Sequence, residues 1–182
     1  MENIVGLDLS LTCTGIAVYN TTDDGITTKV VKTSSKDSDV CRYSKIHSDT
    51  LHEYAFSSIV FIEGYSFGSF SKSSSMSKLI ELGGIIKYDL DNRDIPFVIV
   101  PPTVLKKFIT GKGNAKKEDV KLGVYKKFGR EFKTSDEADA FALVVLGIKY
   151  LNIPSKYSDH ITKIEAACIQ TLKGQESDTK IN

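Results

Sequence analysis

Residues 3–33 read NIVGLDLSLTCTGIAVYNTTDDGITTKVVKT, and this stretch decides the fold. It contains three short runs rich in β-branched and other apolar residues, at 3–9, 15–20 and 27–33. Asp23-Asp24-Gly25, a combination typical of tight turns, separates the last two runs. Three consecutive strands with short connections predict an antiparallel meander.

Beyond residue 33, helical and strand patterns alternate. The run SIVFI at 58–62 is uninterrupted and rich in β-branched residues, which is typical of a strand buried on both faces. A run at 96–100 precedes Pro101-Pro102, and the prolines should end that strand. Apolar residues at near-helical spacing predict four helices, at 39–54, 76–90, 118–128 and 135–151. Ser135 is the expected N-cap of the last helix.

The order β-β-β-α-β-α-β-α-α is that of the ribonuclease H-like fold. This α/β fold has a mixed five-stranded sheet in which three antiparallel strands are extended by two parallel crossover strands and flanked by helices. The length of 182 residues indicates one domain, which we expect over residues 1–152. Residues 153–182 are expected to form a C-terminal extension whose polar end, from Gly174, is disordered.

Composition excludes several classes of protein. With 41% hydrophobic and 26% charged residues, the chain is neither wholly disordered nor of low complexity. No apolar run approaches the roughly 20 residues of a membrane span, and the N-terminus lacks the layout of a secretion signal, so we expect a cytoplasmic protein. Cys13, Cys41 and Cys168 are too widely spaced to indicate a disulfide framework or a zinc site.

The net charge of +1 conceals an asymmetry. Residues 105–133 carry ten basic and three acidic side chains, a local net charge of +7, which leaves −6 for the rest of the chain. Such a positive segment can attract a nucleic-acid backbone, because neutralised phosphates release condensed counterions. Taken alone, however, the pattern more often describes a solvated, lysine-rich helix face.

Four acidic residues occupy the ends of predicted elements. Asp8 ends an apolar run, and Glu63 directly follows the run at 58–62. Asp136 and Asp139 lie three residues apart at the start of the last helix, and therefore on one face of it. Any one of them alone would more often be a turn former or a partner of the helix dipole. If the first and fourth strands are neighbours, however, all four lie at one rim of the sheet.

Clustered carboxylates suggest a metal site. They repel one another, which raises their pKa values, and a divalent cation removes this conflict. Mg²⁺ prefers hard oxygen ligands, which Asp and Glu provide without His or Cys. Two such ions about 4 Å apart can activate a water and stabilise the leaving oxygen of a phosphodiester. The four carboxylates therefore predict two-metal hydrolysis of a nucleic-acid strand.

Three acidic segments, in their order and spacing, resemble the motifs of RuvC-type Holliday junction resolvases. They are residues 6–15 (GLDLSLTCTG), the Ile62-Glu63 strand end and residues 136–140 (DEADA). A fourth match, at 104–120 (VLKKFITGKGNAKKEDV), looks like the Lys- and Gly-containing segment before the family's penultimate helix. The resemblance covers about residues 3–150. The small size and divergent termini are more similar to the virus- or phage-encoded branch of the family.

This resemblance implies a homodimeric endonuclease of DNA recombination and repair, dependent on Mg²⁺ or Mn²⁺, that makes paired nicks in branched DNA. Asp8, Glu63 and Asp139 match the family's central metal-binding carboxylates. Asp136 matches a fourth position, which is more variable in kind. All four are expected to be catalytic and to bind the metal ions.

Lysines and aromatic residues are expected to bind DNA. Lys106 and Lys117 match family lysines implicated in DNA binding and catalysis, with Lys117 the catalytic candidate. The other lysines of this segment are expected to contact DNA: Lys107, Lys112 and Lys116. The family places an aromatic shortly after the second acidic residue, to stack on junction bases. Here the aligned position holds Ser66, so Tyr65 and Phe67 are the candidates, and a looser preference that includes forks and flaps is left open.

Three other functions fit parts of the sequence. A ribonuclease H that cuts RNA–DNA hybrids would use the same fold and carboxylates, although residues 104–120 favour the resolvase. Residues 8–15 also resemble the phosphate-binding hairpin of sugar-kinase and actin-like proteins, but those need two such domains and 182 residues hold one. A non-catalytic DNA-binding module would not need all four carboxylates.

Overall fold

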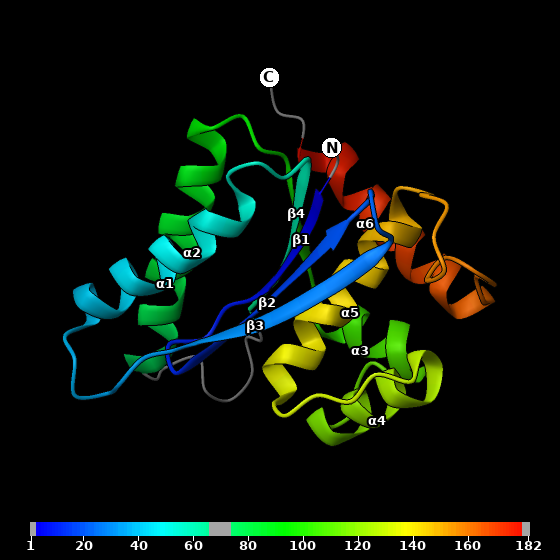
Figure 1. The fold of residues 1–182 in the computed structure, drawn as a ribbon, viewed down its shortest axis with the longest axis horizontal. Coiled ribbons are helices and arrows are strands. Elements are labelled where there is room, and N and C mark those ends of the chain that lie inside the picture. The colour runs from blue at the N-terminus through cyan, green and yellow to red at the C-terminus, as the bar shows by residue number, and fades with distance from the viewer. Residues whose placement is uncertain (1–2, 66–73, 180–182) are drawn as a thin grey trace.

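The computed structural model describes residues 3–65 and 74–179, which are built around one five-stranded sheet (Figure 1). The strands are β1 (Asn3–Asp8), β2 (Cys13–Asn20), β3 (Gly25–Lys32), β4 (Ile59–Glu63) and β5 (Phe97–Val100). The helices are α1 (Asp39–Tyr54), α2 (Ser74–Asn92), α3 (Pro102–Thr110), α4 (Lys117–Phe128), α5 (Ser135–Tyr150) and α6 (Lys163–Thr179).

The strand order is β3-β2-β1-β4-β5. β1 pairs antiparallel with β2, and β2 with β3, which forms the predicted meander. β4 is parallel to β1, and β5 is parallel to β4, because a crossover helix precedes each of them. The predicted mixed sheet is confirmed. In its register Leu7 pairs with Ile62, so Asp8 and Glu63 end neighbouring strands at the same edge.

Helices cover both faces of this sheet (Figure 1): α1 and α2 pack on one face, and α3, α4, α5 and α6 pack on the other. β4 shows why its sequence is apolar throughout. Phe61 belongs to the core beneath α5, whereas Val60 and Ile62 belong to the core beneath α1 and α2. All three are buried, which confirms that this strand is covered on both faces.

α5 packs directly against the backbone of the meander. A Cβ on Gly6 of β1 would lie 2.5 Å from the carbonyl oxygen of Ala140, and a Cβ on Gly15 of β2 would overlap the carbonyl of Asp136. Gly15 pairs with Asp8, so this close approach brings the start of α5 to the carboxyl end of β1. This packing buries α5 from Ala138 to Tyr150. Among the residues that the structure describes, no helix is long and apolar enough to cross a membrane.

Two local features differ from the expectation. The prolines after β5 end the strand, as predicted, but they also begin α3, because proline in the first turn of a helix loses no hydrogen bond. The N-cap of α5 is Thr134 and not Ser135, since the Thr134 hydroxyl accepts a hydrogen bond from the N–H of Glu137 at 3.2 Å.

The C-terminal segment forms a helix. The sequence predicts a disordered end from Gly174, but α6 continues past this residue to Thr179. Residues 180–182 lie outside the described residues. Its apolar residues Cys168, Ile169 and Leu172 join the core of α3, α4 and α5. α6 therefore packs on the same core as the preceding residues.

Candidate active site

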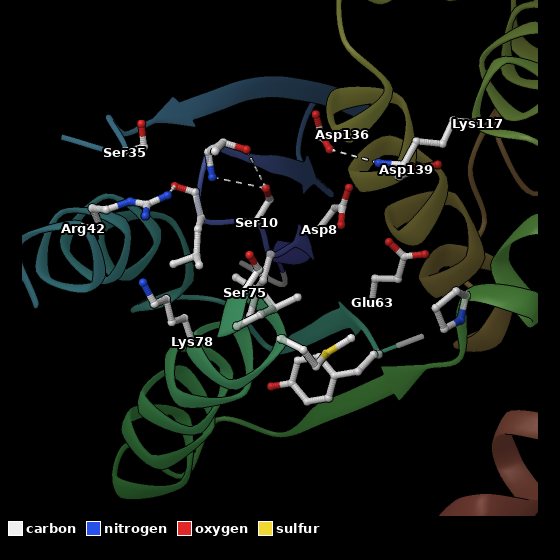
Figure 2. A pocket seen from close by; sticks show the side chains of 18 of the residues that line it. Asp8, Ser10, Ser35, Arg42, Glu63, Ser75, Lys78, Lys117, Asp136 and Asp139 are labelled. Carbon is white, nitrogen blue, oxygen red and sulfur yellow. Dashed lines mark hydrogen bonds and ion pairs between the residues drawn. The ribbon is translucent and has the colours of Figure 1, made fainter. Parts of the chain in front are cut away.

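Asp8, Glu63 and Asp139, here called the acidic triad, meet at one end of the sheet (Figure 2). Asp8 ends β1, Glu63 ends the adjacent parallel strand β4, and Asp139 comes from the second turn of α5. Each offers one carboxylate oxygen, and these oxygens lie within 4.8 Å of one another. Three hard oxygen donors at this separation can hold a divalent metal ion.

Burial and mutual repulsion raise the pKa values of the acidic triad. Asp8 and Asp139 are each only 7% exposed. Burial, followed by the charge of Glu63, raises the pKa of Asp8 well above its ordinary value of 3.8. The same two causes raise the pKa of Asp139 to about 7. Burial also raises the pKa of Glu63. A bound cation would relieve the repulsion that keeps these carboxyls from ionising together.

Asp136 lies in the same cleft but faces a lysine (Figure 2). Its Oδ1 lies 3.5 Å from Nζ of Lys117, the first residue of α4. Burial tends to lower the pKa of Lys117, but the charges of Asp136 and the acidic triad outweigh it and raise that pKa. Lys106 of α3 lines the cleft as well, and its charge opposes the rise in the pKa of Asp139. Two cations therefore border the acidic triad.

The acidic triad opens into a cleft of about 830 Å³. Opposite α3 and α4, the cleft is bordered by the loop between β1 and β2 and by the first turns of α1 and α2 (Figure 2). In the loop, the Ser10 hydroxyl accepts hydrogen bonds from the N–H groups of Thr12 and Cys13, at 3.3 and 3.4 Å. This turn begins two residues after Asp8, whose side chain lines the cleft.

Arg42 of α1 also holds this loop, and sequence reasoning missed it. Its side chain is 8% exposed; Nη2 donates to the carbonyl of Leu11 at 2.8 Å and Nε to the hydroxyl of Thr33 at 3.0 Å. Asp39 lies 3.6 Å from Arg42 and also pairs with Lys78 of α2 at 2.9 Å. One feature of the sequence could have indicated this role: Arg42 lies beside the apolar stripe of its helix. A cation in that position is buried and therefore needs hydrogen-bonding or charged partners.

The other residues predicted to bind DNA fall into three groups. Tyr65 lines the cleft, with its hydroxyl 3.5 Å from the carbonyl oxygen of Ile80 in α2. Three lysines are exposed around the connection of α3 and α4, outside the cleft: Lys107, Lys112 and Lys116. Phe67, like Ser66, lies outside the described residues.

Comparison with known proteins places these features in one family. The family model for crossover junction endodeoxyribonuclease RuvC matches residues 4–146. The chain belongs to the RuvC family. The RuvC match spans the acidic triad, Asp136 and the two lysines beside them, Lys106 and Lys117. The resolvase resemblance inferred from the motifs is thereby confirmed.

RuvC proteins of two bacteria are similar over most of the chain. The RuvC of Ehrlichia canis is 34% identical over 149 residues, covering 79% of this chain and 94% of the relative. The RuvC of Ehrlichia chaffeensis is 36% identical over 128 residues, covering 68% and 80%. Both relatives are named crossover junction endodeoxyribonucleases, which are hydrolases.

Solved RuvC structures have the same fold. Thermus thermophilus RuvC is 25% identical, matches 78% of this chain and 90% of its own, and superposes with a TM-score of 0.59. A second structure, T. thermophilus RuvC in complex with Holliday junction substrate, is 22% identical with a TM-score of 0.61, over 79% and 90% of the two chains. The ribonuclease H-like architecture is therefore confirmed.

Proposed function

We propose that this chain is a metal-dependent endonuclease that resolves Holliday junctions, and accepts forks and flaps, by paired nicks. The observation that carries this proposal is the acidic triad at the floor of an open cleft bordered by Lys106 and Lys117, in a chain of the RuvC family. The T. thermophilus relative bound to Holliday junction substrate supports four-way DNA as the substrate class.

Mg²⁺ is the proposed cofactor, as two ions per site, with Mn²⁺ able to replace it. The donor set fits: the acidic triad offers only carboxylate oxygens, within 4.8 Å of one another, and its raised pKa values reflect a repulsion that a cation relieves. Asp8, Glu63 and Asp139 would hold the metal, with Asp136 beside them. When bound, the metal supplies an activated water and neutralises charge at the scissile phosphate.

The lysines bind and orient the DNA strand. Lys117 is the proposed catalytic lysine: the carboxylates around it raise its pKa, so its ammonium stays protonated and neutralises charge that develops on the phosphate. Lys106 would bind an adjacent phosphate. The exposed lysines of the α3–α4 connection would extend this contact along a DNA arm: Lys107, Lys112 and Lys116.

Paired nicks require two active sites. Each chain supplies one acidic triad within residues 3–65 and 74–179, so cutting two strands of one junction requires two copies. We therefore propose a homodimer. Tyr65, on the wall of the cleft, is the proposed stacking partner for a base at the branch point, and Phe67 is the second candidate by sequence.

The test is cleavage of labelled substrates. Four-way, three-way, flap and linear DNA and an RNA–DNA hybrid would be incubated with Mg²⁺, with Mn²⁺ or with EDTA. We expect paired nicks in the four-way junction with either metal, weaker cutting of forks and flaps, and none with EDTA. Preferential cleavage of the hybrid would instead assign a ribonuclease H activity, and binding without cleavage in either metal would assign a non-catalytic DNA-binding module.

A further inference from the structure

Two adjacent glycines of α2 meet different surroundings. Gly83 is buried beneath Tyr65, and a Cβ built on it would overlap the Tyr65 hydroxyl oxygen. A Cβ built on Gly84 would have no atom within 4 Å. Both glycines disfavour the helix relative to alanine, but only at Gly83 does another part of the chain occupy the space that a side chain would fill.

Tyr65 lies along one face of α2. Its hydroxyl is 3.5 Å from the carbonyl oxygen of Ile80, and its ring centre is 5.8 Å from Nζ of Lys87. Ile80, Gly83 and Lys87 recur at spacings of three and four residues and therefore share a face. The Tyr65 ring thus rests in a seat on α2 whose floor is Gly83.

Tyr65, which occupies this seat, lines the cleft of the acidic triad. Tyr65 follows Glu63 by two residues and lines the same cleft, as do Met76 and Leu79 from the first turns of α2. The cleft therefore has cations beside the acidic triad, at Lys106 and Lys117, and on the α2 side it has apolar side chains next to the Tyr65 ring. Lys78 also lies on the α2 side, where its ammonium is paired with Asp39 at 2.9 Å. This division matches the two parts of a nucleotide, because phosphates bind cations and the faces of bases stack on aromatic rings.

We propose that Gly83 is a positioning residue: the space above it fixes the Tyr65 ring beside the acidic triad, where the ring stacks on a base unpaired at the branch point. This inference rests on the proposed function. It explains how an aromatic residue in a different sequence position from the family's can serve the same cleft. If a side chain filled the space above Gly83, the Tyr65 ring would be displaced from the wall of the cleft.

The overlap predicts a selective effect. In Gly83→Ala the obstructing atom is the far end of a flexible side chain, so the Tyr65 ring moves while α2 keeps its fold. We expect the kcat/KM for four-way junction cleavage to fall about tenfold, since base stacking of this kind contributes roughly that factor or more. Gly84→Ala is the matched control and should stay within about twofold of wild type.

A second variant separates positioning from general damage. Tyr65→Phe removes the hydroxyl that would meet the new Cβ, so Tyr65→Phe combined with Gly83→Ala should recover to within about threefold of Tyr65→Phe alone. In the free protein, the ring carbon resonance of Tyr65, assigned by its loss in Tyr65→Phe, should shift in Gly83→Ala and not in Gly84→Ala.

The outcomes are distinct. Equal activity of Gly83→Ala and Gly84→Ala, an unmoved Tyr65 resonance, or a double variant no better than Gly83→Ala would each overturn the positioning role. A wild-type protein that cuts no branched DNA would overturn the proposed function instead. In that case the resonance still reports whether Gly83 seats Tyr65, but the role in cleavage falls with the activity.

Discussion

Nζ of Lys117 lies 3.5 Å from Oδ1 of Asp136, so the carboxylate next to the acidic triad faces a cation, whereas Asp8, Glu63 and Asp139 face one another. This difference predicts unequal effects of removing charge. Asp8→Asn should abolish cleavage in Mg²⁺ while junction binding stays nearly intact. Asp136→Asn should slow single-turnover cleavage by only about 10–100-fold, the usual effect of losing a group that orients a reactive one.

Rates measured on a labelled four-way junction, with binding measured by gel shift, check both variants. Full activity of Asp8→Asn would refute the metal assignment. An equally complete loss in Asp136→Asn would place that carboxylate among the metal ligands and not with Lys117.

Lys106 and Lys117 border the acidic triad, and each is expected to contact one phosphate. Lys106→Glu should therefore weaken junction binding and flatten its dependence on salt, by about 0.9 in the slope of log K against log [salt] for each lost contact. Lys163→Glu, an exposed change outside the cleft in α6, is the charge-matched control. Binding titrations at several NaCl concentrations give both slopes, and equal slopes would contradict a specific phosphate contact.

Gly15 lets the start of α5 approach the carboxyl end of β1. A Cβ at Gly15 would meet the Asp136 backbone, which cannot move aside as a side chain can, so Gly15→Ala should lower the free energy of unfolding by about 1–3 kcal/mol. Cleavage should also fall because Asp139 shifts with the helix. Urea unfolding measures the first effect. Gly84→Ala, with open space around its Cβ, should be neutral or stabilising by up to about 1 kcal/mol.

The positions of Asp8 and Glu63 could be predicted because they depend on local patterns and one rule of topology. Each residue ends an apolar run, and parallel neighbouring strands bring their carboxyl ends to one edge. The position of Asp139 could be predicted because it lies near the start of a strongly apolar helix. These are the residues for which hydrophobic periodicity and chain order carry the information.

The remaining features depend on contacts between distant parts of the chain. Arg42 binds the carbonyl of Leu11, 31 positions earlier. Gly83 of α2 lies against Tyr65, which follows β4. α3 could not be predicted, because Pro101-Pro102 indicates the end of a strand but not the beginning of a helix. Neither the partner of a buried arginine nor the space above a glycine has a local sequence signature.

Glu165 anchors α6 through two lysines. It is 2% exposed, and its carboxylate lies 2.8 Å from Lys127 and 3.2 Å from Lys149, which is 5% exposed. Glu165→Gln should cost about 3 kcal/mol of stability, because it leaves a buried ammonium without its counter-charge. Glu53→Gln breaks the more exposed pair with Lys29, which is 2.7 Å long, and should cost less than about 1 kcal/mol. Equal midpoints in urea for the two variants would show that the buried pair does not anchor α6.

The raised pKa of Asp139 predicts how stability of the metal-free protein depends on pH. With a pKa of about 7 when folded and an ordinary value of 3.8, the folded chain holds a proton that the unfolded chain has released between these values. Stability from this group is therefore fully present below about pH 4 and is lost as pH rises through 7. Asp139→Asn removes this titration. In EDTA, the Tm of the variant minus the Tm of wild type should therefore increase by several degrees as pH rises from 4.5 to 7.5.

Mg²⁺ provides the complementary measurement for this site. At pH 7.5 the metal should raise the Tm of wild type more than that of Asp139→Asn, because a ligand that binds only the folded state stabilises it and the variant has lost one of the three proposed ligands. Comparing the variant with wild type cancels carboxyls far from Asp139 that titrate in the same range. The charge of Asp139 also raises the pKa of Asp8, so the comparison measures the repulsion within the acidic triad as a whole. A Tm difference that stays constant from pH 4.5 to 7.5, or an equal response of both proteins to Mg²⁺, would contradict a strained carboxylate cluster that a cation relieves.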